Sequence, residues 1–182
     1  MPPLSPTIWR TCRVLNGRIR LQLLRMVITH PGFNVSELAH AVGVGVSDAS
    51  QELRRIQSRG LIRRTCRGPA VVYMPVSDPL VPSAAPLLRA LKSAWATAAA
   101  PNDAIESIAK GLAHERRVAL VRALASHPRA PAELMGEFHT GSKNLTRHLS
   151  ILRQTGWVVW ERRAYHLLPA THPVHVALLK LL

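Results

Sequence analysis

The most constraining feature of this sequence is an internal repeat, because a chain that contains one unit twice must fold into two similar parts. His30-Pro31 recurs 97 residues later as His127-Pro128, and after a one-residue deletion Gly60-Leu61-Ile62 aligns with Gly156-Trp157-Val158 at an offset of 96. Further matched pairs are Leu15 with Leu112, Arg20 with Arg117, Leu23 with Leu120, Arg25 with Arg122, Glu37 with Glu133, Gly45 with Gly141 and Leu53 with Leu149. The repeat predicts two modules, at residues 1–78 and 108–182, joined by a linker at 79–107.

Each module is predicted to hold three helices followed by a β-hairpin. In the first, apolar residues at helical spacing indicate a helix over 11–29, which His30-Pro31-Gly32 ends. Asn34 and Glu37 form a capping-box pattern for a second helix that ends at Gly43, and a third helix is expected over 46–58. Two β-prone segments, 61–64 and 71–74, flank a basic turn at 65–70. This order is that of a winged helix-turn-helix.

The second module repeats this order after a helical linker. Helices are expected at 116–126, from Pro131 and at 142–154, with hairpin strands at 157–162 and 165–168. The region between the modules is marked by Pro75, Pro79, Pro82 and Pro86, and helical segments are expected after them at 87–99 and 102–110. The apolar helix expected at 173–182 needs a partner within the chain or in a second copy. The predicted fold is mainly α with small β-hairpin wings, as two tandem winged helix-turn-helix modules.

The charge of the chain favours a polyanion as its partner. There are 24 Lys and Arg residues against 10 Asp and Glu, which gives a formal net charge of +14. Residues 1–80 hold 11 basic and 4 acidic residues and residues 81–182 hold 13 and 6, so each half carries +7. With no apolar segment long enough to span a bilayer and no secretory signal, we expect a cytoplasmic protein that binds nucleic acid and no membrane.

Two segments of the second module resemble winged-helix transcriptional regulators of the ArsR (arsenic-repressor-like) type. Residues 108–121 resemble their first helix and residues 144–153 their recognition helix, through Arg147-His148-Leu149, Leu152-Arg153 and the following Gly-Trp-Val. The first module shares the resemblance at 15–24 and 35–39, but it has Gln51-Glu52 where the second has Arg147-His148. The similarity covers about 130 of the 182 residues.

The resemblance implies a transcriptional regulator, and more specifically a repressor, that binds double-stranded DNA. Members of the family are usually homodimers of one module that read two half-sites about one helical turn apart. A tandem chain can supply both modules itself, as a monomer that acts as a covalent pseudo-dimer. A homodimer with four modules is the alternative, and the sequence does not choose between them.

The DNA-binding candidates are polar residues on the third helices and arginines on the wings. On the third helix of the second module they are Ser142, Lys143, Asn144, Thr146 and Arg147. On that of the first module they are Ser47, Ser50, Gln51 and Arg54, and on the wings Arg63, Arg64, Arg67, Arg162 and Arg163. Arginine and lysine can donate to guanine or phosphate, asparagine can pair with adenine, and hydroxyls can bind phosphate. Asp48 and Glu52 are expected to repel phosphates, so base reading by the first module stays open.

Other chemistries have weaker support in the sequence. His166, His172 and His175 could form a nitrogen-rich metal site, but ordinary polar surface is the preferred interpretation, and we expect no metal or cofactor. Cys12 and Cys66 are expected to be free thiols, and Cys66 lies among arginines that favour its thiolate. No catalytic pattern recurs, so no enzyme is expected.

The competing function is a winged-helix module for protein-protein interaction or for architectural binding of nucleic acid. The basic charge favours DNA over the protein-interaction module, and the few aromatic residues do not form a platform for single strands. Trp157 is expected to fill the core where Leu61 does, whereas Trp160 is open to packing or stacking.

Overall fold

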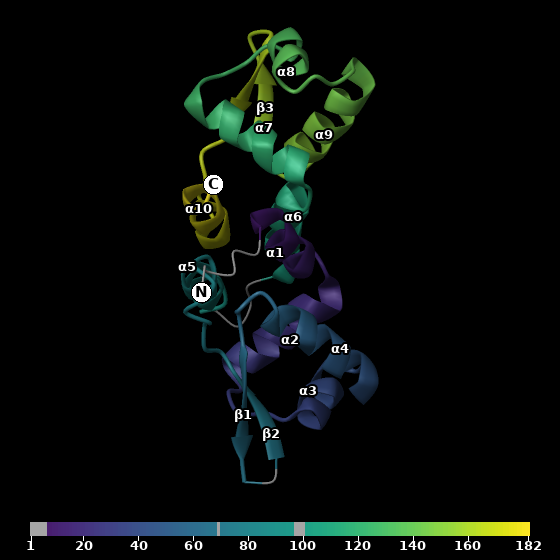
Figure 1. Cartoon of the computed structure of the whole chain (residues 1–182), viewed down its shortest axis with the longest axis vertical. Coiled ribbons are helices and arrows are strands. Elements are labelled where there is room, and N and C mark those ends of the chain that lie inside the picture. Colours follow the sequence, from purple (N-terminus) through teal and green to yellow (C-terminus); the bar gives the residue numbers. More distant parts are fainter. Residues whose placement is uncertain (1–6, 69, 97–100) are drawn as a thin grey trace.

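The computed structural model describes residues 7–68, 70–96 and 101–182, and it is mainly helical with two antiparallel two-stranded hairpins. The molecule is elongated, and the hairpins lie at opposite ends of its long axis (Figure 1). No described helix has the length and apolarity needed to cross a membrane.

The same order of elements occurs in both halves of the chain. The first half, residues 7–96, contains α1 (Ile8–Leu15), α2 (Arg18–Thr29), α3 (Val35–Val42), α4 (Val46–Gln57), β1 (Arg63–Arg67), β2 (Ala70–Met74) and α5 (Ala84–Ala94). The second half, residues 101–182, contains α6 (Asn102–Leu112), α7 (Glu115–Ser126), α8 (Pro131–Glu137), α9 (Ser142–Gln154), β3 (Val158–Glu161), β4 (Ala164–Leu167) and α10 (Pro173–Lys180). Each half therefore has four helices, a hairpin and a closing helix.

The single helix expected over 11–29 is wrong, because the chain forms two helices that separate at Asn16 and Gly17. Gly17 has extended backbone (φ −120°, ψ 116°) and is the N-cap of α2. The Arg20 side chain donates through Nε to the Val14 carbonyl oxygen at 2.9 Å and through Nη2 to that of Arg13 at 3.1 Å. These bonds satisfy carbonyls that the end of α1 leaves open. The apolar pattern continues across the break, so periodicity alone did not reveal it.

A matching contact ends α6 in the second half. Arg117 follows Arg20 by 97 positions, and it donates through Nε to the Gly111 carbonyl at 2.6 Å and through Nη2 to the Lys110 carbonyl at 3.0 Å. Arg117 is only 8% exposed, and this burial lowers the pKa of its guanidinium group. The repeat therefore extends from residue types to the hydrogen bonds that they make.

Several helix ends lie at the capping residues that the sequence indicated. The Glu37 N–H donates to Asn34 Oδ1 at 3.0 Å, and the Asn34 N–H donates to Glu37 Oε2 at 2.7 Å. The α3 helix ends at Gly43, which is left-handed (φ 74°) as a C-cap glycine requires. Pro131 is the first residue of α8, and α9 has the predicted bounds. These predictions are confirmed.

The hairpins are regular, and each is tied to the helical part of its half. β1 pairs with β2 from Arg63–Met74 to Arg67–Ala70, and β3 pairs with β4 from Val158–Leu167 to Glu161–Ala164. Single bridges join Asn34 to Val72 and Arg129 to Tyr165. The first strand was expected at 61–64, but Leu61 and Ile62 are buried before it begins, and residues 65–67, expected in the turn, extend it. The β1–β2 hairpin is therefore longer than predicted.

The two halves meet through equivalent helices. α1 packs against α6, and α5 packs against α10, so that these four helices form the middle of the molecule (Figure 1). Apolar side chains that are at most 1% exposed fill this region, namely Leu15, Leu87, Leu91, Ile105 and Leu178. The apolar surface of α10 thus has a partner within the chain. α5 begins at Ala84, before the predicted 87, and residues 97–99 of that expected helix lie outside the described residues.

Candidate nucleic-acid interface

The α9 helix presents the predicted recognition residues to solvent. Its apolar side, made by Leu145, Leu149 and Leu152, is buried, and this fixes the opposite side outward. All five predicted residues of this helix are exposed, namely Ser142, Lys143, Asn144, Thr146 and Arg147. No side chain caps the helix at Gly141, so its first turn keeps backbone N–H groups that can donate to an outside acceptor.

The turn before α9 has a backbone conformation that glycine provides in the first half. His139 has φ 44°, and it aligns with Gly43, whose φ is 74°. A non-glycine residue pays roughly 1–2 kcal/mol for this left-handed conformation. Arg116 Nη1 donates to Thr140 Oγ1 at 3.3 Å and so links the turn to α7. The turn between α3 and α4 and the turn between α8 and α9 therefore have the same hand.

Two histidines lie behind the exposed face of α9. The ring centroids of His114 and His148 are 4.7 Å apart. Burial lowers the pKa of both imidazoles, and the positive charge of Arg117 lowers each pKa further. Nδ1 of His148 is buried and has no hydrogen-bond partner among the described residues. These rings therefore support α9 as neutral groups at neutral pH.

We expect mild acid to destabilise the fold through these histidines. His114, His148 and the buried His175 have folded-state pKa values lowered chiefly by burial, below the value of about 6.5 expected in the unfolded chain. As the pH falls below about 6.5, the unfolded chain binds more protons than the folded one, and the stability present above that pH is lost. Thermal unfolding should show a lower Tm at pH 5.5 than at pH 7.5.

Single substitutions of histidine show which side chains cause the loss of stability at low pH. His148→Gln and His175→Gln should each narrow the Tm difference between the two pH values, whereas His40→Gln, on the exposed face of α3, should leave it as it is in the parent protein. A parent Tm that is equal at both pH values would contradict the expectation.

The α4 helix offers a less basic face than α9. Ser47, Gln51 and Arg54 are exposed, and Ser50 is half-buried. The structure corrects one expectation, because Glu52 does not face outward as a free charge: it pairs with Arg20 at 3.0 Å and with Arg55 at 2.5 Å, and its side chain is 18% exposed. Asp48 remains exposed in the first turn. α4 and α9 thus differ in charge at aligned positions.

The wing arginines are all exposed. Arg63, Arg64 and Arg67 lie along β1. Arg162 and Arg163 form the two-residue turn between β3 and β4, and both have left-handed backbone, with φ 49° and 63°. Two-residue hairpins of this kind strongly favour Asn-Gly, because both central residues need positive φ. Two arginines are therefore held at this tip against their conformational preference, which is a pattern associated with functional sites.

The tryptophans near the second wing have different roles. Trp157 is fully buried, donates through Nε1 to the Ile108 carbonyl at 3.0 Å, and has its ring centroid 4.0 Å from that of His175. Its predicted core role is confirmed, and the expectation of polar surface is wrong for His175. Trp160 is 41% exposed and lies 4.8 Å from Tyr165 across the hairpin, centroid to centroid.

The described part of the chain has no cluster of side chains for a metal ion, and its two cysteines are free thiols. Within residues 7–68, 70–96 and 101–182, no group of three or more His, Cys, Asp or Glu side chains is placed to hold a metal ion. Cys12 is buried, and this burial raises the pKa of its thiol well above the usual range. Cys66 is exposed on β1.

Sequence reasoning missed two residues that hold the candidate interface in shape. Arg117 fixes the end of α6, and His139 takes the left-handed position in the turn before α9. Both carried a signal, since Arg117 is a repeat match of Arg20 and His139 aligns with Gly43. The lining of the cavity between the halves, described below, had no such signal.

The chain matches no protein-family profile, and no curated protein matches it significantly in sequence. What the interface can bind therefore follows from its own residues: exposed donors on α9, arginines on both wings and a net charge of +14.

Proposed function

We propose that this chain is a cytoplasmic transcriptional regulator, a repressor, that binds double-stranded DNA through two tandem winged helix-turn-helix modules of the ArsR type. The observation that carries the proposal is the exposed N-terminal part of α9, where five polar or basic residues share one solvent-facing surface with an uncapped helix end. A recognition helix enters the major groove with this part toward the base edges.

The chemistry of that surface suits duplex DNA. Arg147 and Lys143 can donate to guanine or phosphate, and Asn144 can make a paired contact to adenine. The hydroxyls of Ser142 and Thr146 and the free N–H groups of the first turn can bind phosphate oxygens and fix the register of the helix. Base reading is therefore assigned to Lys143, Asn144 and Arg147.

The packing of the halves supports a covalent pseudo-dimer. An isologous interface places the same elements of two subunits against each other, and here α1 meets α6 and α5 meets α10 within one chain. In Figure 1 both α4 and α9 lie on one side of these central helices, away from α5 and α10. We infer that one chain offers α4 and α9 to one face of the DNA, with the wings at the outer ends.

The wing tip provides a prediction in which stability and binding change in opposite directions. Replacing Arg162 by Asn and Arg163 by Gly relieves two left-handed arginines, so we expect stability to rise by about 1–2 kcal/mol. Thermal unfolding measures this gain. If both arginines contact phosphates, the slope of log affinity against log salt should become shallower by up to about 2.

The exposed Arg89 on α5 provides the control for these wing variants. Arg89→Asn removes one positive charge far from a primed turn, so it should change neither the stability nor the salt slope by a comparable amount. An unchanged salt slope in the wing double variant would remove this tip from the DNA interface.

The second candidate function is a protein-interaction module. Trp160 with Tyr165 on the second wing and Val46 at the start of α4 are the observations that favour it, since Trp160 is 41% and Val46 48% exposed. Exposed aromatic and aliphatic residues of this kind are common at protein interfaces.

Binding to a pool of duplex genomic fragments at about 50 and 200 mM salt tests the proposal, with the bound fraction sequenced. Six or more phosphate contacts predict a loss of about a thousandfold in affinity between these salt concentrations. Enrichment of one motif, with one chain per motif by native mass, supports the pseudo-dimer. Two chains per motif would favour the homodimer, binding without enrichment an architectural role, and no binding the protein-interaction module.

A further inference from the structure

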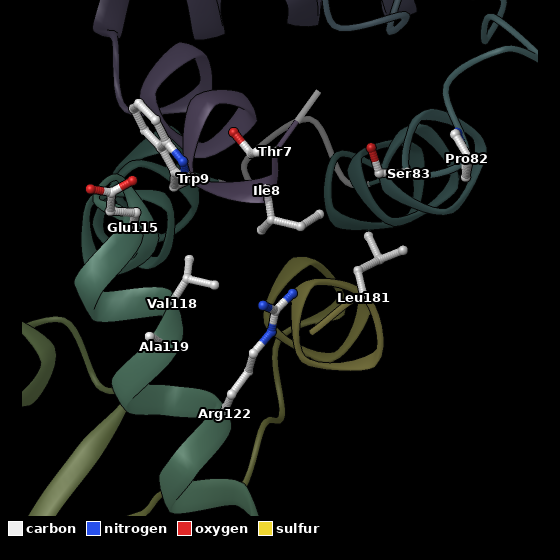
Figure 2. A pocket seen from close by; sticks show the side chains of 10 residues that line it. All are labelled: Thr7, Ile8, Trp9, Pro82, Ser83, Glu115, Val118, Ala119, Arg122 and Leu181. Atoms are coloured by element: carbon white, nitrogen blue, oxygen red, sulfur yellow. The ribbon is translucent and has the colours of Figure 1, made fainter. Parts of the chain in front are cut away.

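A cavity of about 450 Å³ lies where the two halves meet, and its walls come from both of them. The first half contributes the starts of α1 and α5, and the second half contributes α7 and the end of α10 (Figure 2). A volume of this size is within the range of sites for small organic ligands, about 300–1,000 Å³.

The walls combine apolar side chains with one cation. Ile8, Val118, Ala119 and Leu181 supply apolar surface, and the guanidinium of Arg122 points into the space between Ile8 and Leu181 (Figure 2). Arg122 is held in place by its Nε, which donates to the main-chain oxygen of Leu182 at 2.8 Å. Its two terminal nitrogens are turned toward Ile8. This geometry suits an apolar molecule that carries a carboxylate, because a guanidinium binds a carboxylate through paired N–H donors.

The repeat shows what fills the equivalent place in the other half. Arg25 is the counterpart of Arg122, and its guanidinium carbon lies 6.0 Å from the ring centroid of Trp95. Arg25 Nη1 and Trp95 Nε1 both donate to Asn102 Oδ1, at 3.3 and 3.0 Å. Trp95 is only 5% exposed. An indole ring and an acceptor oxygen therefore occupy that site together.

The cavity beside Arg122 differs from the surroundings of Arg25 because a smaller side chain aligns with Trp95. An offset of 87 aligns Leu87 with Val174 and Leu91 with Leu178, all four of them buried, and it places Leu182 opposite Trp95. Leucine lacks the indole ring that lies beside Arg25. The alignment therefore places the cavity beside Arg122 next to the position that corresponds to Trp95 in the first half.

We propose that this cavity is a binding site for a small aromatic carboxylate, with the ring between Ile8, Val118 and Leu181 and the carboxylate on Arg122. The ligand reproduces the indole and the oxygen that the protein itself supplies beside Arg25. Glu115 and the hydroxyls of Thr7 and Ser83 also line the cavity and can accept hydrogen bonds from donors on the ring. The site does not depend on DNA binding.

Calorimetric titration of the full chain with indole-3-acetate tests this site, because the probe combines an indole with a carboxylate. We expect saturable binding of one molecule per chain, and weaker binding of the neutral indole-3-acetamide. Arg122→Gln should lower the affinity for indole-3-acetate about tenfold or more and remove the preference for the acid over the amide. Arg89→Gln, outside the cavity, should change neither.

Because Arg122 also holds the end of α10, a second variant separates binding from folding. Ala119→Trp places an indole in the cavity while leaving Arg122 intact, and we expect it to abolish binding of the probe without lowering Tm. Equal affinity in Ala119→Trp and the parent protein, or no saturable binding up to about 10 mM, would overturn the proposal.

Discussion

Replacing Lys143 and Arg147 together by alanine is expected to weaken binding to the enriched DNA motif by about a hundredfold or more. A good paired contact to a base contributes about 1–3 kcal/mol of discrimination, and 1.4 kcal/mol corresponds to tenfold in affinity. Both side chains are exposed on α9, so their removal should change stability by less than about 0.5 kcal/mol. Titration of labelled duplex with parent and variant protein, at one salt concentration, measures the loss.

Two single substitutions serve as controls for the Lys143/Arg147 double variant. Arg153→Ala removes an exposed arginine from the last turn of the same helix, and it should cost far less because that turn is distant from the base edges. Gln51→Ala changes the position in α4 that aligns with Arg147, and a smaller loss than for Arg147→Ala would show that α9 dominates reading. Equal losses of affinity for Gln51→Ala and Arg147→Ala would mean that both α4 and α9 read bases. An unaltered affinity in the Lys143/Arg147 double variant would contradict the proposed interface.

The second large effect concerns stability, at Gly111. A Cβ atom at this position would overlap the indole of Trp157 and lie 2.7 Å from Thr155 Oγ1. Gly111→Val should therefore displace Trp157 and break its hydrogen bond to the Ile108 carbonyl, which has a distance of 3.0 Å. Overpacking costs about 1–3 kcal/mol and a buried polar group without its partner about 1–3 more. We expect a loss of about 3–4 kcal/mol, seen as a fall in Tm of roughly 10 °C.

The first half suggests how to reverse that loss. Val14 aligns with Gly111, and Leu61 aligns with Trp157. The first half therefore combines a larger residue at the position of Gly111 with a smaller residue at the position of Trp157. Gly111→Val combined with Trp157→Leu should therefore be more stable than Gly111→Val alone, although Thr155 still limits the recovery. If the second substitution instead adds a further loss, the clash with Trp157 is not the cause of the instability.

Local signals in the sequence predicted most of the helical framework. Capping at Asn34, the left-handed Gly43 and the N-terminal Pro131 each act within one turn, so they fix a helix end without help from distant residues. The solvent-facing residues of α9 followed as well, because Leu145, Leu149 and Leu152 lie on one side of any helix with that sequence.

What the sequence did not predict depends on contacts between distant residues. The break between α1 and α2 is fixed by Arg20, whose side chain reaches back to Val14, while the apolar pattern passes through the break. Glu52 has two partners, and only Arg55 lies within one helical turn of it, whereas Arg20 is 32 residues away. The cavity beside Arg122 needs α1, α5, α7 and α10 together, and no single stretch of sequence carries that arrangement.

The packing of α1 on α6 and of α5 on α10 has a consequence for gene dosage. A regulator assembled from two chains dissociates at low concentration, so the occupancy of its site varies with the square of its copy number when copies are few. In the proposed pseudo-dimer the two halves are one covalent chain, and folding replaces that association. Occupancy of a DNA site by such a pseudo-dimer is expected to rise in simple proportion to copy number, so a cell that holds only a few molecules would still obtain a graded response.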